Sequence, residues 1–167
     1  MELRVTTASD EAFLLDLLNT TPVVDGVPTD ALPDLATSAE WLAAHEVPVR
    51  TQEWTALVEA RGALQAVVRG DASPAVLQPF LSGVRLAARV GKDGVNWHLE
   101  GASGAARAVL AWDGLRLTGP GRLRPCANTE CRLFLIDRSK PNTARWCSMA
   151  ICGNRMKARR HYQRSRR

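Results

Sequence analysis

Four cysteines constrain this chain more than any other feature of its sequence. They form two pairs with four residues inside each pair and fifteen residues between the pairs: Cys126 and Cys131, then Cys147 and Cys152. Charge divides the chain at the same place. Residues 121–167 hold 13 Lys and Arg against two acids, a net charge of +11, whereas residues 1–120 have a net charge of −6 and no cysteine. The sequence therefore predicts an acidic body followed by a small basic module that contains every thiol.

The cysteine spacing favours one tetrahedral metal site. Two short-spaced pairs let two turns converge on one ion, and four soft thiolates are typical of a structural zinc site. Two disulfides and an iron–sulfur cluster are the alternatives. The N-terminus has no signal-peptide pattern, which indicates a cytoplasmic protein with reduced thiols and disfavours disulfides. We expect one structural Zn²⁺ with four ligands, Cys126, Cys131, Cys147 and Cys152.

The segment between the cysteine pairs predicts a hairpin. Residues 133–136 are apolar and strand-like, and residues 139–143 contain Pro141 and Asn142 and predict a turn. Residues 144–149 are expected to run back as the second arm of the hairpin. We expect a small core from Phe134, Ile136, Trp146 and Met149. We also expect the negative charge of a four-thiolate zinc site to be balanced by nearby guanidinium groups, namely Arg124, Arg132, Arg145 and Arg155.

The chain after Cys152 predicts a basic helix. Seven of its last thirteen residues are Lys or Arg and none is acidic. Arg155 and Arg159 are four residues apart, as are Arg160 and Arg164, which indicates a row of guanidinium groups that can contact phosphates. A solvated charged face is the alternative, and a membrane-surface helix is disfavoured because no apolar stripe is present. The expected nucleic-acid contacts are Asn154, Arg155, Lys157, Arg159, Arg160, His161 and Arg164.

The two residues directly after the last cysteine have two interpretations. Asn154 and Arg155 lie where a bound metal would fix the backbone, so they could read base edges. They could equally brace the metal site through hydrogen bonds to sulfur or to the hairpin. The sequence leaves both interpretations open.

The body reads as mostly helical. Apolar spacing and start and stop signals predict helices over 9–18 with Ser9 as the cap, over 38–45, over 51–69 ended by Gly70, over 73–88 with Ser73 as the cap, and over 103–117. In the fourth helix the expected buried stripe is Leu77, Phe80, Leu81, Val84 and Ala88. Residues 21–35 predict a loop. Alternation over 95–99 predicts one short strand, with Leu3 and Val5 as its suggested partners.

The body contains no recognisable catalytic motif. It lacks the glycine-rich phosphate loops and the nucleophile elbow, so we expect no enzyme. His45 and His98 are expected to be structural or surface residues. The four tryptophans of the body are expected in the core, with a ligand pocket as the alternative: Trp41, Trp54, Trp97 and Trp112. No stretch reaches 18 apolar residues, so no membrane span is expected.

Two known families are suggested by short motifs. Residues 126–161, with Arg145-Trp146-Cys147-Ser148-Met149, Cys152-Gly153-Asn154-Arg155, Lys157 and Arg159-Arg160-His161, resemble the CGNR zinc finger. The body resembles the helical ABATE domain that usually precedes this finger in bacterial proteins, through Leu18-Asn19-Thr20, Asp30-Ala31-Leu32 and Trp41-Leu42. The resemblance implies a stress-related bacterial transcriptional regulator. Its finger would bind double-stranded DNA and its helical domain would sense a ligand or partner.

The expected architecture is mainly α. A helical ABATE-like domain with little β-structure would span 1–117, a hinge 118–124, and a CGNR-type module of zinc-bound β-hairpin plus basic helix 125–167. A small-molecule ligand in the helical domain and a homodimer that reads a two-part DNA site are the expected further partners. The alternatives are an RNA-binding zinc protein and a protein-interaction adaptor whose zinc module is purely structural.

Overall fold

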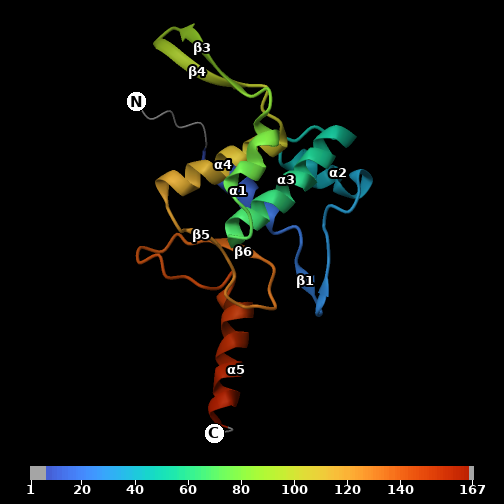
Figure 1. The fold of residues 1–167 in the computed structure, drawn as a ribbon, viewed down its shortest axis with the longest axis vertical. Coiled ribbons are helices and arrows are strands. Elements are labelled where there is room, and N and C mark those ends of the chain that lie inside the picture. The colour runs from blue at the N-terminus through green and yellow to red at the C-terminus, as the bar shows by residue number, and fades with distance from the viewer. Residues whose placement is uncertain (1–6, 166–167) are drawn as a thin grey trace.

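A helical body leads into a small hairpin module and a projecting C-terminal helix (Figure 1). The computed structural model describes residues 7–165. The body contains α1 (Ala8–Leu18), β1 (Val23–Val24), β2 (Val27–Pro28), α2 (Leu35–Ala44), α3 (Thr51–Arg69), the 3₁₀-helix η1 (Pro74–Leu81), β3 (Arg85–Gly91), β4 (Gly94–Glu100) and α4 (Gly104–Thr118). The module contains β5 (Leu123–Pro125), β6 (Phe134–Ile136), the π-helical turn η2 (Met149–Gly153) and α5 (Asn154–Ser165). The mainly α fold class expected from the sequence is confirmed.

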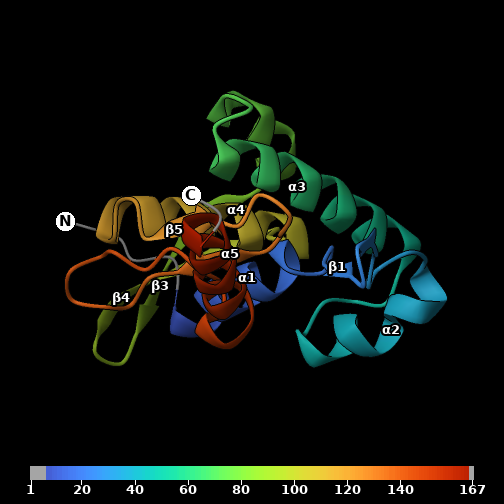
Figure 2. The ribbon, with the colours of Figure 1, turned by 90° about the horizontal axis from the view of Figure 1, so that it is seen from below.

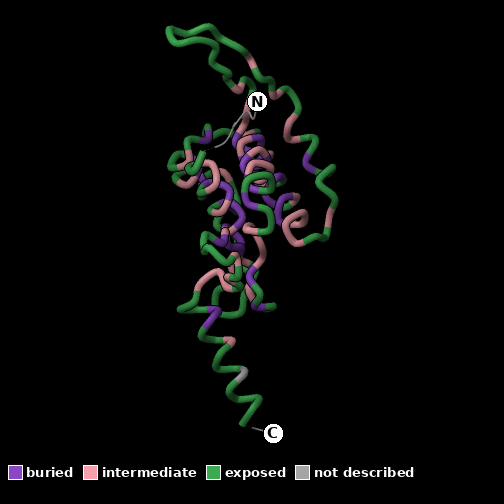
Figure 3. Tube along the Cα trace, turned by 90° about the vertical axis from the view of Figure 1, so that its left-hand side faces the viewer, coloured by how far each residue is buried: buried purple, intermediate pink, exposed green. Residues whose placement is uncertain are grey.

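The core lies where α1, α3 and α4 meet. Each helix buries residues three or four positions apart, such as Leu14 and Leu17 in α1 and Leu57 and Ala60 in α3. In α4 the buried positions are largely alanines, and their small side chains let neighbouring helices approach closely. These buried segments run through the middle of the molecule, whereas the β3–β4 hairpin at one end and α5 at the other are mostly exposed (Figure 3).

Three of the helix boundaries follow the sequence signals. α3 spans the expected residues and ends at Gly70, whose φ of +83° lies in the left-handed region that favours glycine. Ser103 caps α4 as expected, by accepting from the N–H of Ala106. Ser73 likewise caps η1, with Pro74 in its first turn.

Two helix starts differ from the expectation. The cap of α1 is Thr7 and not Ser9, because Thr7 and Asp10 form a reciprocal capping box in which each side chain accepts from the other residue's N–H. α2 begins at Leu35, three residues earlier than expected, because the Asp34 carboxylate caps it by accepting from the N–H of Thr37 at 2.8 Å.

The helix predicted over residues 73–88 is wrong in its second half. It ends at Leu81, and the following residues form β3, which pairs antiparallel with β4 through a two-residue turn. Ala88 is therefore an exposed strand residue rather than a buried helical one. Gly83 and Gly101 lie against each other at the base of this hairpin: a Cβ on Gly101 would lie 2.5 Å from the carbonyl oxygen of Gly83.

The strand predicted over 95–99 is part of β4, and its partner in the structure is β3. The suggested partners Leu3 and Val5 lie outside the described residues. Trp97 is 44% exposed on this hairpin, so its expected place in the core is wrong. The other three tryptophans pack against the core, partly buried. His45 packs against Trp41 in a tilted arrangement with ring centroids 4.2 Å apart, and His98 is exposed, as structural and surface roles predict.

An ion pair between a buried arginine and an exposed aspartate holds the segment that was predicted as a loop. This segment contains the small β1–β2 hairpin. Arg61 of α3 is 5% exposed and donates two hydrogen bonds to Asp30, at 2.6 and 2.7 Å, and one to Thr20 at 2.8 Å. The Leu18-Asn19-Thr20 and Asp30-Ala31-Leu32 motifs are thus joined through one arginine.

The β5–β6 hairpin packs directly on the helical body. Phe134 of β6 is 1% exposed and belongs to the same apolar core as α1 and α3. The guanidinium of Arg69 lies 4.5 Å from the centre of the Phe134 ring and donates to the carbonyl of Arg132 at 3.0 Å. Leu123 and Arg124, the last residues of the expected hinge, lie in β5. None of the helices within residues 7–165 combines the length and apolar character that crossing a membrane requires.

Candidate metal centre and adjoining basic helix

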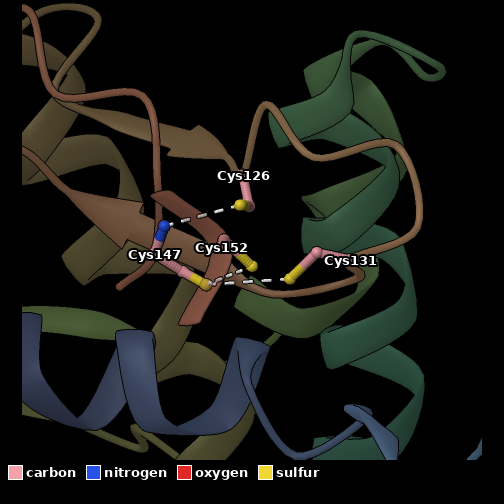
Figure 4. A group of neighbouring side chains, drawn as sticks. All are labelled: Cys126, Cys131, Cys147 and Cys152. Carbon is pink, nitrogen blue, oxygen red and sulfur yellow. Dashed lines mark hydrogen bonds between the residues drawn. The ribbon is translucent and has the colours of Figure 1, made fainter. Parts of the chain in front are cut away.

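The four cysteines come together from separate segments of the module. Cys126 follows β5 directly, Cys131 ends the next turn, Cys147 lies on the returning segment, and Cys152 lies in the π-helical turn that leads into α5 (Figure 4). Their sulfur atoms all lie within 4.8 Å of one another. The sequence expectation that two distant pairs would converge is therefore met.

The sulfur spacing fits a tetrahedral zinc ion. The Sγ atoms of Cys131 and Cys147 are 3.7 Å apart, as are those of Cys147 and Cys152. A Zn–S bond of about 2.3 Å in a tetrahedron requires sulfur atoms about 3.8 Å apart. A disulfide requires about 2.05 Å, and all four cysteines are free. The donor set and its spacing therefore match the expected metal rather than the two disulfides.

Neutral N–H groups from the module donate to the sulfurs. Asn128 is fully buried, and its amide nitrogen lies 3.6 Å from the Sγ of Cys152. Its side-chain oxygen accepts from the N–H of Glu130, and its carbonyl accepts from the N–H of Cys131. The backbone N–H of Cys147 donates to the Sγ of Cys126 at 3.5 Å. Such donors orient the ligands and disperse thiolate charge.

The thiols differ in how readily they ionise without a metal. Burial raises the pKa of Cys131 to about 11 and also raises the pKa of Cys147. Burial acts in the same direction on Cys152, but the hydrogen bond from Asn128 and those from the neighbouring thiols outweigh it and lower the pKa. Two of the ligands therefore hold their protons at neutral pH unless a cation replaces them.

Two of the four expected balancing arginines, Arg124 and Arg145, have other partners. The Nη2 of Arg124 lies 3.4 Å from the carboxylate of Asp137 and also donates to Asn142. Asp137 is 2% exposed and accepts from the N–H groups of Ser139 and Ala144 at 2.8 and 2.7 Å. Arg145 lies over the Trp146 ring at 5.4 Å. In the described residues the hydrogen bonds to sulfur come from amides and thiols, not from guanidinium groups.

The small core expected for the module is only partly formed. Phe134 is buried, and Ile136 and Trp146 are partly buried. Met149 is 53% exposed, so its expected burial is wrong. Its thioether nevertheless covers Gly153: a Cβ at that position would lie 2.7 Å from the Met149 sulfur. A side chain at position 153 would therefore have to displace the Met149 thioether from its place beside the turn that carries Cys152.

α5 begins two residues after Cys152 and extends away from the body (Figure 1), and Figure 2 shows the molecule along the axis of this helix. Asn154 is exposed and donates to the carbonyl of Ala150 at 3.3 Å, which braces the π-helical turn. Arg159 pairs with Glu130 at 2.9 Å. The other expected contact residues lie along α5, and those whose side chains are described are exposed: Arg155, Lys157, His161 and Arg164.

The basic positions of α5 form two rows rather than one. Residues five positions apart on an α-helix are separated by about 140° around its axis, so positions 155 and 159 do not share a face with positions 160 and 164. The first row faces the finger, because Arg159 contacts Glu130 there. The second row also contains Lys157 and is directed away from that contact.

Comparison with known families identifies both parts of the chain. Residues 11–125, more than half of the chain, match the ABATE family, described as "Putative stress-induced transcription regulator". Residues 122–165 match the CGNR zinc finger. The chain belongs to the ABATE family. Both families occur in the order that the sequence motifs suggested, and no curated protein matches the chain.

The family assignment and the sulfur geometry together define the metal. The four cysteines of the CGNR finger form one structural zinc site. Sequence reasoning missed Asn128, which donates to Cys152, and Asp137, which holds the turn of the module between Ser139 and Ala144. The sequence contains a signal for each of them. Asn128 is a polar residue inside the first Cys-x4-Cys turn, and Asp137 is one of two acids in a strongly basic module. Glu130, the second acid, pairs with α5.

An open cavity of about 980 Å³ separates parts of the ABATE domain and the CGNR finger. Its wall on the ABATE side includes Leu15, Asn19 and Val23, and its wall on the finger side includes Leu133 and Ile151. Arg155 and three of the zinc ligands, Cys131, Cys147 and Cys152, also line it. The sequence placed a ligand site within residues 1–117, whereas this cavity takes its walls from both domains.

Proposed function

We propose that this protein is a DNA-binding transcriptional regulator in which α5 contacts the duplex. The observation that carries this proposal is the position of α5: a basic helix that begins two residues after a zinc ligand and stands clear of the body (Figure 1). Its twelve residues give a length of about 18 Å, and the major groove of B-DNA is wide enough to admit an α-helix. The zinc site supplies the rigid base that such a helix needs.

The charges of α5 support a polyanionic partner. Arg159 has an acidic partner, but Lys157 and Arg164 take part in no ion pair within the described residues. Both are exposed. An isolated twelve-residue helix with this much like charge is marginal in water, so neutralisation by phosphates would stabilise it. The second row, at positions 157, 160 and 164, is thus suited to phosphate contacts. Arg155, at the zinc-anchored end of α5, is suited either to reading base edges or to bracing the metal site.

A salt-titrated binding assay tests the proposal. Duplex DNA, hairpin RNA and an acidic protein are compared as partners, and log K is measured against log salt concentration. We expect duplex DNA to bind tightest, with a slope that falls by about one when Lys157→Ala removes a phosphate contact. Lys92→Ala is the matched control, because it removes an equal charge at the other end of the molecule. Preference for RNA or for the acidic protein would support the corresponding alternative and contradict this proposal.

We also propose that the cavity between the two domains is the sensor site. It touches the ABATE body, the zinc ligands and Arg155, so an occupant would contact both the sensing and the DNA-binding parts. The apolar walls and the arginine suit a compound with an apolar body and one anionic group. The test uses the dye 1-anilinonaphthalene-8-sulfonate, which has this chemistry. Val23→Asp should weaken dye binding several-fold, whereas Val24→Asp should not, because Val24 does not line the cavity.

The remaining expectations follow from this role. We propose that the protein is not an enzyme, since its four cysteines serve as metal ligands and the sequence carries no recognised catalytic motif. We propose that residues 1–117 act as the sensing domain, 118–124 as a connection and 125–167 as the DNA-binding module. A regulator of bacterial genes would act in the cytoplasm, at the nucleoid when bound to DNA.

A further inference from the structure

The β3–β4 hairpin has one entirely apolar face. Residues directly opposite each other in an antiparallel pair share a face, and alternate pairs share the same face. The pairs on one face are Leu86 with Leu99, Ala88 with Trp97, and Val90 with Val95. The pairs on the other face are Arg85 with Glu100, Ala87 with His98, and Arg89 with Asn96. The charges of the strands are therefore confined to one side, where Arg89 and Glu100 also form an ion pair at 2.7 Å.

This apolar face is open to solvent. Val90 is 87% exposed, Val95 58%, Trp97 44% and Leu86 39%. The hairpin extends from the body at the opposite end of the molecule from α5, and its strands pack mainly on each other (Figures 1 and 3). An isolated two-stranded hairpin is at best marginally stable in water, so burial of this face would stabilise the structure.

We propose that the apolar face of the β3–β4 hairpin is a homodimer interface, in which the same face of a second copy covers it. An uncharged face of this kind requires a partner surface that is equally uncharged, because opposing a buried apolar surface with charge is costly. The hairpin itself is such a surface. A two-fold axis along the strands places Trp97 of one copy over the partner's Ala88, so that the largest side chain of the face meets the smallest.

The area of the face agrees with a reversible dimer. Covering the six apolar side chains of this face removes roughly 450 Å² of accessible surface from each copy and about 900 Å² in total. That total lies at the low end of specific interfaces, so the expected dissociation constant is on the order of micromolar. The interface lies far from α5 and forms without DNA, so it does not depend on the proposed DNA binding.

Sedimentation equilibrium of the full zinc-loaded chain tests the interface. The parent protein should pass from monomer to dimer as its concentration rises to about 200 µM. Val95→Lys introduces a charge on the apolar face and should weaken dimerisation at least tenfold. Asn96→Lys introduces the same charge at the next position, on the polar face, and should leave the dimer intact. Both side chains are exposed, so neither substitution disturbs the core.

Three outcomes would overturn the proposal. The first is a parent protein that stays monomeric at the highest concentration. The second is equal weakening by Val95→Lys and Asn96→Lys, which would place the interface elsewhere. The third is binding to phosphatidylcholine vesicles that Val95→Lys abolishes, because the face would then belong to a lipid surface. Unchanged zinc content and circular dichroism confirm that each variant is folded.

Discussion

Asn19 and Phe134 exchange two hydrogen bonds across the boundary between the helical body and the finger. The side-chain oxygen of Asn19 accepts from the N–H of Phe134 at 2.7 Å, and its amide nitrogen donates to the carbonyl of Phe134 at 3.3 Å. Asn19 follows the last turn of α1, and Phe134 begins β6. The Asn19 side chain therefore supplies hydrogen-bond partners to the outer edge of the finger's hairpin, as a third strand would. The Phe134 ring lies beside it in the core of the body.

Removing this link should loosen the finger from the body. Asn19→Ala leaves the Phe134 N–H and carbonyl without their partner, and we expect a loss of about 1–2 kcal/mol in the free energy of unfolding. Limited proteolysis should then cut faster near residues 118–124. Asn96→Ala, in the exposed hairpin, is the control and should change neither measurement. If Asn19→Ala is as stable and as protease-resistant as the parent protein, the two hydrogen bonds do not join the domains.

Zinc affinity should increase with pH. In the metal-free fold, burial raises the pKa of Cys131 to about 11 and also raises that of Cys147, so zinc must displace protons from these thiols at neutral pH. Chelator competition between about pH 6 and 8 should therefore show tighter binding at the higher pH, with proton release on binding. Asn128→Ala removes the donor to Cys152 and should weaken zinc binding by roughly tenfold. A pH-independent affinity would contradict the displacement of thiol protons.

Removing zinc should also disorder α5. The helix begins two residues after Cys152, and its charge and length make it marginal without an anchor. We expect a chelator to reduce the helical circular dichroism signal by about the contribution of one twelve-residue helix. The helical body should still unfold in a cooperative transition on heating. Loss of the whole helical signal on chelation would show instead that the body depends on the finger.

The Arg61–Asp30 pair should stabilise the body only above acidic pH. Burial alone would raise the pKa of Asp30, but the hydrogen bonds from Arg61 and from the N–H of Leu32 lower it below its usual 3.8. The folded state thus favours the carboxylate, and the resulting stability is present above pH 3.8 and lost as pH falls through the lower folded pKa. At neutral pH, Asp30→Asn should cost about 2 kcal/mol in chemical denaturation, whereas Asp25→Asn in the exposed hairpin turn should cost little.

Glu130 should restrain DNA binding. It pairs with Arg159 at 2.9 Å and places a negative charge beside the proposed DNA-contacting helix. Glu130→Gln frees the guanidinium and removes repulsion of phosphate, so we expect affinity for duplex DNA to rise by roughly two- to fivefold at low salt. Glu59→Gln, an exposed charge on α3, should leave affinity unchanged. Weaker DNA binding by Glu130→Gln would indicate that the pair holds α5 in its binding position.

At the β3–β4 hairpin, the local sequence pattern was insufficient to predict the secondary structure. Leu77, Phe80, Leu81, Val84 and Ala88 repeat at helical spacing, whereas Leu86, Ala88 and Val90 repeat at strand spacing. Asp93-Gly94, flanked by alternating apolar residues, is a strong hairpin signal that the helical pattern obscured. Trp97 then lies on an extended hairpin instead of in the core, because its strand pairs with β3 and not with the body.

The sequence alone determined the metal site and the order of the domains. The spacing of the four cysteines admits few arrangements other than convergence on one ion, and the charge division marks where the finger begins. It also determined α3 and α4, whose caps and apolar faces are local properties of the chain. Helix propensity, capping and ligand spacing depend on residues a few positions apart, so a sequence records them directly.

Only the tertiary structure decided which residues join these parts. Asn19 contacts Phe134 across 115 positions, and Arg107 reaches Asp10 across 97. Asn128 contacts Cys152, and Glu130 contacts Arg159, only because zinc-ligand turns bring separate segments together. Such contacts depend on the packing of buried surface, which has no period and no fixed spacing along the chain, so no local pattern could reveal them.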